Sequence, residues 1–346
     1  MAVYLNASSA EFAKNCGKMT ALQLGQSTEL PYFKAFAQQY LTLDELYQLL
    51  DKHIQQCCLQ AGWNSENSAN VPIFLGSTGY VLADCEARLA NHQPLPTEYS
   101  IAVIGERLRQ RYQTEVFSFA TSCTSSAQGV YYAYQALQAG LAEKALVIGF
   151  ETFNRLTFEH FHAMHFLAEN ENSLTFIAPE GMILGEGVGC LALSKVKSQD
   201  FCCELTAMTN LTDCENLTNN SLGSFERLIE KILAQDNVLA QQITGVKAHA
   251  VGGNFDTAEH EFLATHFPHS TWFMPKAYIG HTLGASGVTE TAFLVDCLQQ
   301  GKFPDLQKNV QNQPLFSEKT LPNGYYLNYF LGFGGSNVGW LMKWEK

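Results

Sequence analysis

The amino-acid sequence predicts an α/β fold, in which strands and helices alternate along the chain. Short apolar runs rich in β-forming residues alternate with segments of helical periodicity. Several of these runs are apolar at every position, as expected of strands that are covered on both faces. Apolar residues make up 46% of the 346 residues and are spread over the whole length. The chain can therefore bury a large core, as one large domain or two of ordinary size.

The predicted elements follow from these runs in order. The predicted strands are Val116–Ala120, Ala145–Phe150, Val188–Leu193, Val246–Val251, Tyr325–Phe330 and Val338–Met342. The predicted helices are Leu43–Ala61, Ser125–Ala139, Ser224–Leu239 and Val288–Gln300. The segment from Lys195 to Leu222 is richer in Asn, Thr and Asp, which predicts a connection between two halves.

A faint internal repeat supports two similar halves. One predicted helix closes with Ala136–Gly140 and another with Cys297–Gly301, and each follows a cluster of small residues, Thr121–Ala127 and Gly280–Gly287. Two copies of one α/β unit would explain this similarity. Coincidence is the alternative, because helices often end at glycine. We place the boundary so that residues 1–196 form the first half and residues 197–346 the second.

Charge and patterning exclude several classes of partner. The formal net charge is −12, and no basic run or aromatic-interleaved Lys/Arg stripe occurs, so nucleic acid is a poor candidate partner. No run of about 18 apolar residues predicts a membrane-spanning helix. Residues Met1–Asn6 lack the basic and apolar regions of a secretory signal. We therefore expect a cytoplasmic protein without a membrane partner.

Metal binding is not predicted. The ten cysteines include the adjacent pairs Cys57-Cys58 and Cys202-Cys203, which lack the spacing of metal ligands, and in the cytosol they would be reduced. The segment His160–His165 holds three histidines and offers the alternative of a metal site. No second cluster of ligand residues accompanies it, and its interleaved Phe and Met indicate a packed or pocket-lining segment.

The strongest local signal is Phe119–Ala127, where a predicted strand runs into small hydroxyl residues and then a helix. Cys123 should lie at the N-terminus of that helix, whose partial positive charge favours the nucleophilic thiolate. The small neighbours would let the backbone approach a bound thioester closely. A buried cysteine that merely begins a packed helix is the structural alternative.

This segment, Thr-Ser-Cys-Thr-Ser-Ser, resembles the nucleophile elbow of β-ketoacyl synthases, condensing enzymes of the thiolase superfamily, whose usual form is Thr-Ala-Cys-Ser-Ser-Ser. Other matches follow in the family's order between residues 116 and 343. They are Gly185–Gly189 (Gly-Glu-Gly-Val-Gly), Lys276–Thr282 (Lys-Ala-Tyr-Ile-Gly-His-Thr), Glu290 nine positions after His281, and Gly332–Asn337 (Gly-Phe-Gly-Gly-Ser-Asn). Order and spacing together make the resemblance specific. We treat Glu186 as structural.

One motif departs from the family pattern. Ala248–Asn254 stands where the family has His-Gly-Thr-Gly-Thr. His249 matches the histidine, but Val251 and Gly253 replace the two threonines, which in the family face the phosphopantetheine arm. Asp256 and Glu259 continue the motif one position early. The departure bears on recognition of the carrier protein.

The resemblance implies decarboxylative condensation of malonyl-carrier protein with an acyl group held on Cys123, in fatty-acid, polyketide or polyene synthesis. His249 and His281 would donate hydrogen bonds to the thioester oxygen. Lys276 and Glu290 would form a buried ion pair that positions the histidines. This Cys-His-His set is typical of elongating members.

Further expectations come from the same resemblance. The backbone N–H groups of Cys123 and Phe333 would form the oxyanion hole, and Phe333 would gate entry. The fold would be thiolase-like, with mixed five-stranded sheets layered α/β/α/β/α. No cofactor or metal is implied, because acyl carrier protein delivers the substrates on phosphopantetheine. A homodimer, or a heterodimer with a related subunit, would form through the strand before the nucleophile.

Two other functions stay open. The chain could be a partner subunit of the chain-length-factor type, with little or no activity of its own. Alternatively, it could be a transferase or hydrolase of the same superfamily that uses the cysteine without decarboxylation. Acyl chain length, starter unit and pathway depend on pocket volume, which sequence periodicity does not measure.

Overall fold

The computed structural model describes residues 1–63, 70–171, 176, 180–198, 202–215, 218, 220–301 and 321–346. Its strands are β1 (Val3–Phe12), β2 (Gly17–Gln23), β3 (Gln26–Tyr32), β4 (Ile73–Gly76), β5 (Val116–Phe119), β6 (Lys144–Glu151), β7 (Gly187–Ser194), β8 (Cys202–Thr212), β9 (Ile243–Lys247), β10 (Thr271–Phe273), β11 (Gly324–Leu331) and β12 (Ser336–Glu345). Its helices are α1 (Leu43–Gln60), α2 (Leu82–Ala90), α3 (Ala102–Tyr112), α4 (Ser125–Gln138), α5 (Arg155–Ala163), α6 (Leu222–Gln235), α7 (Asp256–His266), α8 (Lys276–Ile279) and α9 (Ser286–Gln300). The predicted α/β class is confirmed.

The strands follow the same order in both halves. From one edge to the other the described sheet runs β10-β9-β11-β12-β8-β1-β7-β6-β4-β5. In the first half β4 is parallel to β5 and β6, whereas β7 is antiparallel to β6 and β1. The second half repeats this pattern, with β9 parallel to β10 and β11, and β12 antiparallel to β11 and β8. We propose that two copies of one unit meet at the predicted boundary, between β7 and β8.

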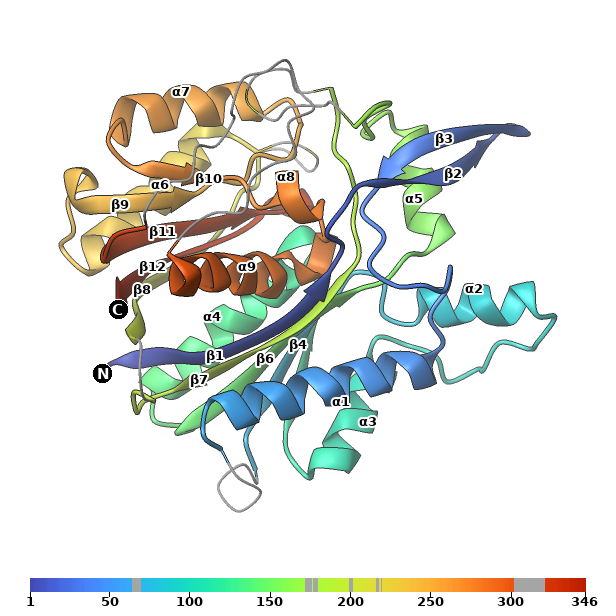
Figure 1. Cartoon of the computed structure of the whole chain (residues 1–346), viewed down its shortest axis with the longest axis horizontal. Coiled ribbons are helices and arrows are strands. Elements are labelled where there is room, and N and C mark those ends of the chain that lie inside the picture. Colours follow the sequence, from blue (N-terminus) through green and yellow to red (C-terminus); the bar gives the residue numbers. More distant parts are fainter. Residues whose placement is uncertain are drawn as a thin grey trace.

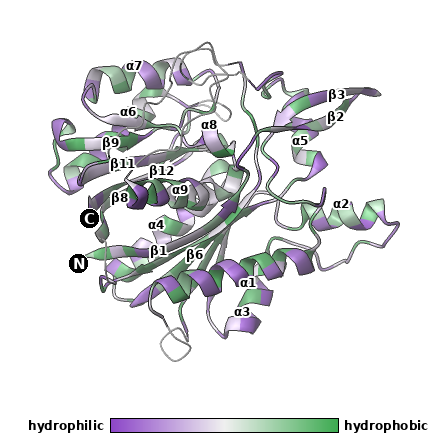
Figure 2. Cartoon of the chain, in the orientation of Figure 1, coloured by the Kyte–Doolittle hydropathy of each residue, from purple (hydrophilic) through white to green (hydrophobic). Residues whose placement is uncertain are grey.

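The layers are stacked as helix, sheet, helix, sheet, helix (Figure 1). One apolar cluster joins α1 and α3 to the outer face of the first sheet, and another joins α6 and α7 to the outer face of the second. Between the sheets, α4 and α9 share a third cluster with both. Strands β6 and β7 are mainly hydrophobic, whereas α1 carries a hydrophilic outer side (Figure 2).

The two predicted five-stranded sheets are continuous. Strand β1 pairs with β8 at Val3–Leu205 and Tyr4–Glu204, which links the sheets into one ten-stranded sheet in the described residues. The first strand predicted from the sequence was Val116–Ala120, whereas β1 already forms at Val3–Phe12 because it pairs with β7 along most of its length.

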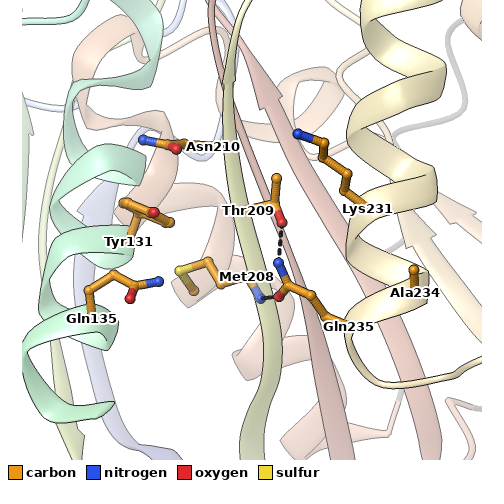
Figure 3. Close-up of a pocket in the computed structure, with 8 residues that line it drawn as sticks. All are labelled: Tyr131, Gln135, Met208, Thr209, Asn210, Lys231, Ala234 and Gln235. Atoms are coloured by element: carbon orange, nitrogen blue, oxygen red, sulfur yellow. Dashed lines mark hydrogen bonds between the residues drawn. The ribbon is translucent and has the colours of Figure 1, made fainter. Parts of the chain in front are cut away.

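The segment Lys195–Leu222 is not only a connection, as predicted, because it contains β8. This strand pairs with β12 over its whole length. Two polar groups of β8 are bonded by Gln235 of α6, which donates to the Thr209 hydroxyl at 2.6 Å and accepts from the N–H of Met208 at 2.9 Å (Figure 3). Side-chain hydrogen bonds of this kind allow a polar sequence to form an inner strand.

The boundaries of α6 and β9 differ from those predicted. Helix α6 was predicted to reach Leu239 but ends at Gln235, and Asn237 soon after it has a left-handed φ of 51°. The Ser221 side chain accepts from the N–H of Ser224, which starts the helix earlier than predicted. Strand β9 was predicted to reach Val251 but ends at Lys247. The carboxylates that bond the N–H groups of the following loop explain this end and are described with the candidate site.

Candidate active site

Cys123 lies in a tight turn between β5 and α4. The turn is a single 3-10 turn, Ser122–Thr124, and α4 starts at the next residue. Ser122 adopts a left-handed φ of 57°, an uncommon conformation outside glycine. The Ser125 hydroxyl stabilises the turn, since it accepts from the N–H of Thr121 at 2.9 Å and donates to the carbonyl of Ser122 at 2.7 Å. The predicted position of Cys123 at the start of the helix is confirmed.

The Cys123 sulfur is buried, and only 7% of the residue is exposed. It belongs to an apolar cluster with Leu283, and Val251 and Phe333 pack against that cluster. Burial raises the pKa of the thiol to about 12, whereas the charge of Lys276 and the backbone N–H groups of Phe333 and Cys123 lower it. The backbone N–H groups act in the predicted direction, but desolvation is the larger effect and favours the neutral thiol.

His281 is held by main-chain bonds on both sides. Its N–H donates to the carbonyl of Ile183 at 2.8 Å, and its carbonyl accepts from the N–H of Gly185 at 3.0 Å. The ring Nδ1 lies 3.3 Å from the Ser286 hydroxyl. Burial, followed by the charge of Lys276, lowers the pKa of His281 to about 3. The ring is therefore a neutral imidazole at physiological pH.

His249 lies beyond the end of β9, and its ring centroid is 6.2 Å from that of His281 at an interplanar angle of 84°. Its Nδ1 is buried without a hydrogen-bond partner among the described residues. Burial, followed by the charge of Lys276, lowers the pKa of His249 well below its ordinary value. The structure thus brings together two neutral imidazoles.

Two carboxylates shape the loop that carries His249. Glu259 accepts from the N–H of His249 at 2.6 Å and from that of Ala250 at 2.9 Å. Asp256 accepts from the N–H groups of residues 251, 252 and 253. These N–H groups bond to side chains instead of a neighbouring strand, so β9 ends before His249 rather than at Val251.

The predicted ion pair is present and has a third member. The Lys276 Nζ lies 2.7 Å from Glu290 Oε1 and 2.9 Å from the carbonyl of His249. Lys247, which the sequence analysis missed, places its Nζ 2.9 Å from Glu290 Oε2. Both lysines are buried, and together they lower the pKa of Glu290 to about 2 against the effect of desolvation. The sequence did contain a signal for Lys247, because it is an ionisable residue in a mostly apolar strand, two positions before His249.

Aromatic rings surround the predicted gate. The Phe333 ring stacks on Phe161 at a centroid distance of 6.1 Å and contacts Phe166 at 5.5 Å. Phe161 lies within the histidine-rich segment His160–His165 and Phe166 follows it directly, so this part of the chain contributes rings to the site. Across the part of the chain that the structure describes, no group of three His, Cys, Asp or Glu side chains could hold a metal ion.

A second missed residue is Glu151, at the end of β6. Its buried carboxylate accepts from the N–H groups of Thr78, Gly79 and Gly284 and from the Thr78 hydroxyl. Gly284 lies three positions after His281, so Glu151 ties the loop of the second histidine to the first half. Glu186 accepts from three main-chain N–H groups, at residues 35, 36 and 153, which confirms that it is structural.

Both halves of the chain, which together build the site, match models of one protein family. Residues 4–199 match the family "Beta-ketoacyl synthase, N-terminal domain", and residues 205–309 match "Beta-ketoacyl synthase, C-terminal domain". The chain belongs to the β-ketoacyl synthase family.

Curated relatives of this β-ketoacyl synthase chain are much longer proteins. The non-reducing polyketide synthase Preu3 of Preussia isomera is 26% identical over 303 residues, which cover 79% of this chain and 12% of that protein. The pikromycin polyketide synthase component PikAII of Streptomyces venezuelae is 26% identical over 281 residues, which cover 72% of this chain and 8% of that protein. The chain spans about a tenth of the length of these relatives.

Solved β-ketoacyl synthase structures share the whole fold. A β-ketoacyl synthase from Burkholderia phymatum has a TM-score of 0.81 at 16% identity, over 100% of both chains. The ketosynthase ApeO in complex with its chain length factor ApeC, from Xenorhabdus doucetiae, gives a TM-score of 0.79 at 15% identity, over 99% of this chain and 98% of that one. The predicted thiolase-like fold is confirmed. Among the described helices of this family member, none is long and apolar enough to cross a membrane.

Proposed function

We propose that the chain catalyses decarboxylative condensation of malonyl-carrier protein with an acyl group on Cys123, as a 3-oxoacyl-carrier-protein synthase of fatty-acid, polyketide or polyene synthesis. The observation that carries this is the pair of buried, neutral imidazoles, His249 and His281, with ring centroids 6.2 Å apart. Lys276 bonds to the main chain of His249 and lowers the pKa of Cys123, which links the pair to the thiol.

The first step loads the acyl group. The Cys123 sulfur attacks the acyl thioester, a sulfur–carbon bond forms, and the bond to the carrier's sulfur breaks. The thiol proton passes to the departing thiolate, so the step needs no external acid or base. The N–H groups of Cys123 and Phe333, which face the sulfur, would stabilise the oxyanion that forms on the carbonyl.

The second step forms the carbon–carbon bond. A malonyl thioester loses carbon dioxide, and the electron pair moves into an enolate whose oxygen becomes negative. Neutral imidazoles can donate hydrogen bonds to that oxygen without giving up a proton. The enolate carbon then attacks the acyl carbonyl, and the Cys123 thiolate leaves. Buried His249 and His281 are suited to this role because they are uncharged before the charge develops.

Partners follow from the relatives and from the fold. Among structurally similar ketosynthases, one was solved with its chain length factor and another with an acyl carrier protein. For this chain we propose a carrier protein that delivers phosphopantetheine-bound substrates in the cytosol, with no resident cofactor. Val251 and Gly253 offer no hydroxyl to the pantetheine arm, and the N–H groups of that loop are already bonded to Asp256, so other groups would have to bind the arm.

A dimer through β5 completes the proposal. In the described sheet β5 is an edge strand, with Phe117 46% exposed. A groove of about 1440 Å³ runs along β5 and the adjacent side of α4. An exposed apolar edge strand readily pairs with another chain, either a second copy or a related subunit.

The experiment supplies the purified chain with an acyl-carrier protein and malonyl-carrier protein, and measures carbon dioxide and β-ketoacyl product. The proposal predicts both in the parent chain and no condensation in Cys123→Ala. Product formation that is unchanged in Cys123→Ala, in a preparation that retains a second intact synthase, would support the partner-subunit alternative. Turnover of acyl thioester without carbon dioxide would support the transferase or hydrolase.

A further inference from the structure

Lys247 is a buried cation beside the two histidines that the family resemblance does not include. Its side chain is fully buried, and it ends β9 two positions before His249. A buried ammonium is costly unless it is paired. The Glu290 carboxylate forms ion pairs with both Lys276 and Lys247, so one negative charge is shared between two positive charges.

The surroundings of Lys247 favour the charged form in spite of burial. Its Nζ lies 2.9 Å from Glu290 Oε2 and 3.5 Å from the centroid of the Phe330 ring, whose face attracts a cation. Burial lowers the pKa of Lys247 to about 8, against the attraction of Glu290. Near neutral pH the two lysines and Glu290 therefore carry a net charge of about +1.

That net charge acts on both imidazoles. Lys276 and Lys247 each oppose protonation of His249 and of His281, whereas Glu290 favours protonation of His281. Besides Lys247 itself, on β9, three charged or titratable groups act on Lys247 or on the two histidines. They are Lys276 on α8, Glu290 on α9 and Glu259 on α7. Without Lys247, the negative charge of Glu290 would cancel the positive charge of Lys276. Little net electric field would then act on the imidazole rings of His249 and His281.

We propose that Lys247 is a positioning residue that acts through Glu290. It holds the carboxylate against Lys276 and gives the cluster a net positive charge, which adds to burial in keeping His249 and His281 neutral and favours negative charge on a substrate oxygen between them. This inference rests on the proposed function for its catalytic consequence. Its effect on the imidazoles does not depend on that function.

The test replaces Lys247 with the uncharged, similarly long methionine. Lys247→Met leaves Glu290 paired with Lys276, a net-neutral pair. The matched control is Lys52→Met, which removes an exposed lysine paired with Glu11. Two quantities are measured as a function of pH. The first is the protonation of the histidine rings in the free protein, by proton NMR, and the second is carbon dioxide release from malonyl-carrier protein. If Lys247→Met is not recovered folded, Lys247→Gln serves in its place.

The expected result in Lys247→Met is a rise of about one pH unit in the titration of His249 or His281, with the low-pH limb of decarboxylation moving up by the same amount. Acyl loading of Cys123 stays within about twofold, and Lys52→Met matches the parent at the rings of His249 and His281. Unchanged titration, or loss of activity equally at all pH values, would overturn the inference. So would protonation of either ring in the parent chain above about pH 6. If the parent neither loads Cys123 nor releases carbon dioxide, the proposed function fails, whereas the NMR result still decides the role of Lys247.

Discussion

Several buried carboxylates around the candidate site bind main-chain N–H groups rather than substrate-facing side chains. Glu259 and Asp256 hold the loop of His249, and Glu151 binds the loop that follows His281. A carboxylate with several N–H partners fixes a loop that no strand supports. The histidines are thus positioned by groups that lie behind them.

Glu151 should make stability depend on pH. Burial raises its pKa from 4.5 to about 7. Because the folded chain holds this proton more tightly than the unfolded chain, the contribution of Glu151 to stability falls as pH rises from about 4.5 to about 7. Glu151→Gln removes this term, so between those pH values the parent should lose about 3 kcal/mol more unfolding free energy than the variant. Urea unfolding of both proteins at the two pH values checks this, and equal losses would contradict it.

His281→Ala should separate the two proposed steps. Removing one donor to the developing enolate should lower decarboxylation by about 10²- to 10³-fold, because the charge is left with one imidazole. Loading of Cys123 should change little. The measurement is carbon dioxide release beside acyl mass on the protein. A parallel loss of both steps would instead show that His281 serves the nucleophile.

At the scale of elements, the two halves place equivalent turns back to back. Ser122 begins the turn before α4 with a φ of 57°, and Leu283 begins the turn before α9 with a φ of 43°. The two helices then pack very closely, since a Cβ on Gly287 would lie 2.2 Å from the backbone nitrogen of Ala127. The clusters of small residues, Thr121–Ala127 and Gly280–Gly287, therefore allow α4 and α9 to pack closely, in addition to any role beside the bound thioester.

Gly287→Val should therefore separate the two helices. The added side chain meets the backbone of α4, which cannot move aside, so we expect a loss of more than about 3 kcal/mol in unfolding free energy or failure to fold. Gly223→Val is the matched control, because a Cβ there meets nothing closer than 3.8 Å. Thermal and urea unfolding compare the two. Similar stability of both variants would contradict the close packing.

At the scale of the whole molecule, β5 is both the edge of the described sheet and the strand that leads to Cys123. Pairing across this edge would bury the turn that holds the nucleophile. The proposed dimer is thus coupled to the site, and a partner chain would add residues near the groove. Oligomeric state and activity should therefore change together.

Phe117→Asp should weaken the dimer. The charge would be placed on an exposed apolar edge that the partner must cover, so the dissociation constant should rise at least about 100-fold. Leu59→Asp is the control, because Leu59 is 79% exposed on α1, away from β5. Light scattering over a dilution series measures the change. A parent chain that is monomeric, or a Phe117→Asp dimer as tight as the control, would contradict the proposed interface.

The sequence predicted the elements whose apolar pattern is continuous and the site residues that carry family motifs. It missed β8, whose Thr209 hydroxyl and Met208 N–H are bonded by Gln235 of α6, a contact between segments distant in the chain. It also placed the end of β9 too late, since side-chain carboxylates replace the strand partner. Lys247 and Glu151 were missed for the same reason: their roles come from partners in other elements.

The most direct test of the account is mass spectrometry of the chain after incubation with an acyl-carrier protein, followed by proteolysis. With Cys123 as the nucleophile, we expect an acyl adduct on the peptide that contains Cys123, its removal when malonyl-carrier protein is added, and no adduct in Cys123→Ala. An unmodified Cys123 in folded protein, or an adduct on a different residue, would contradict it.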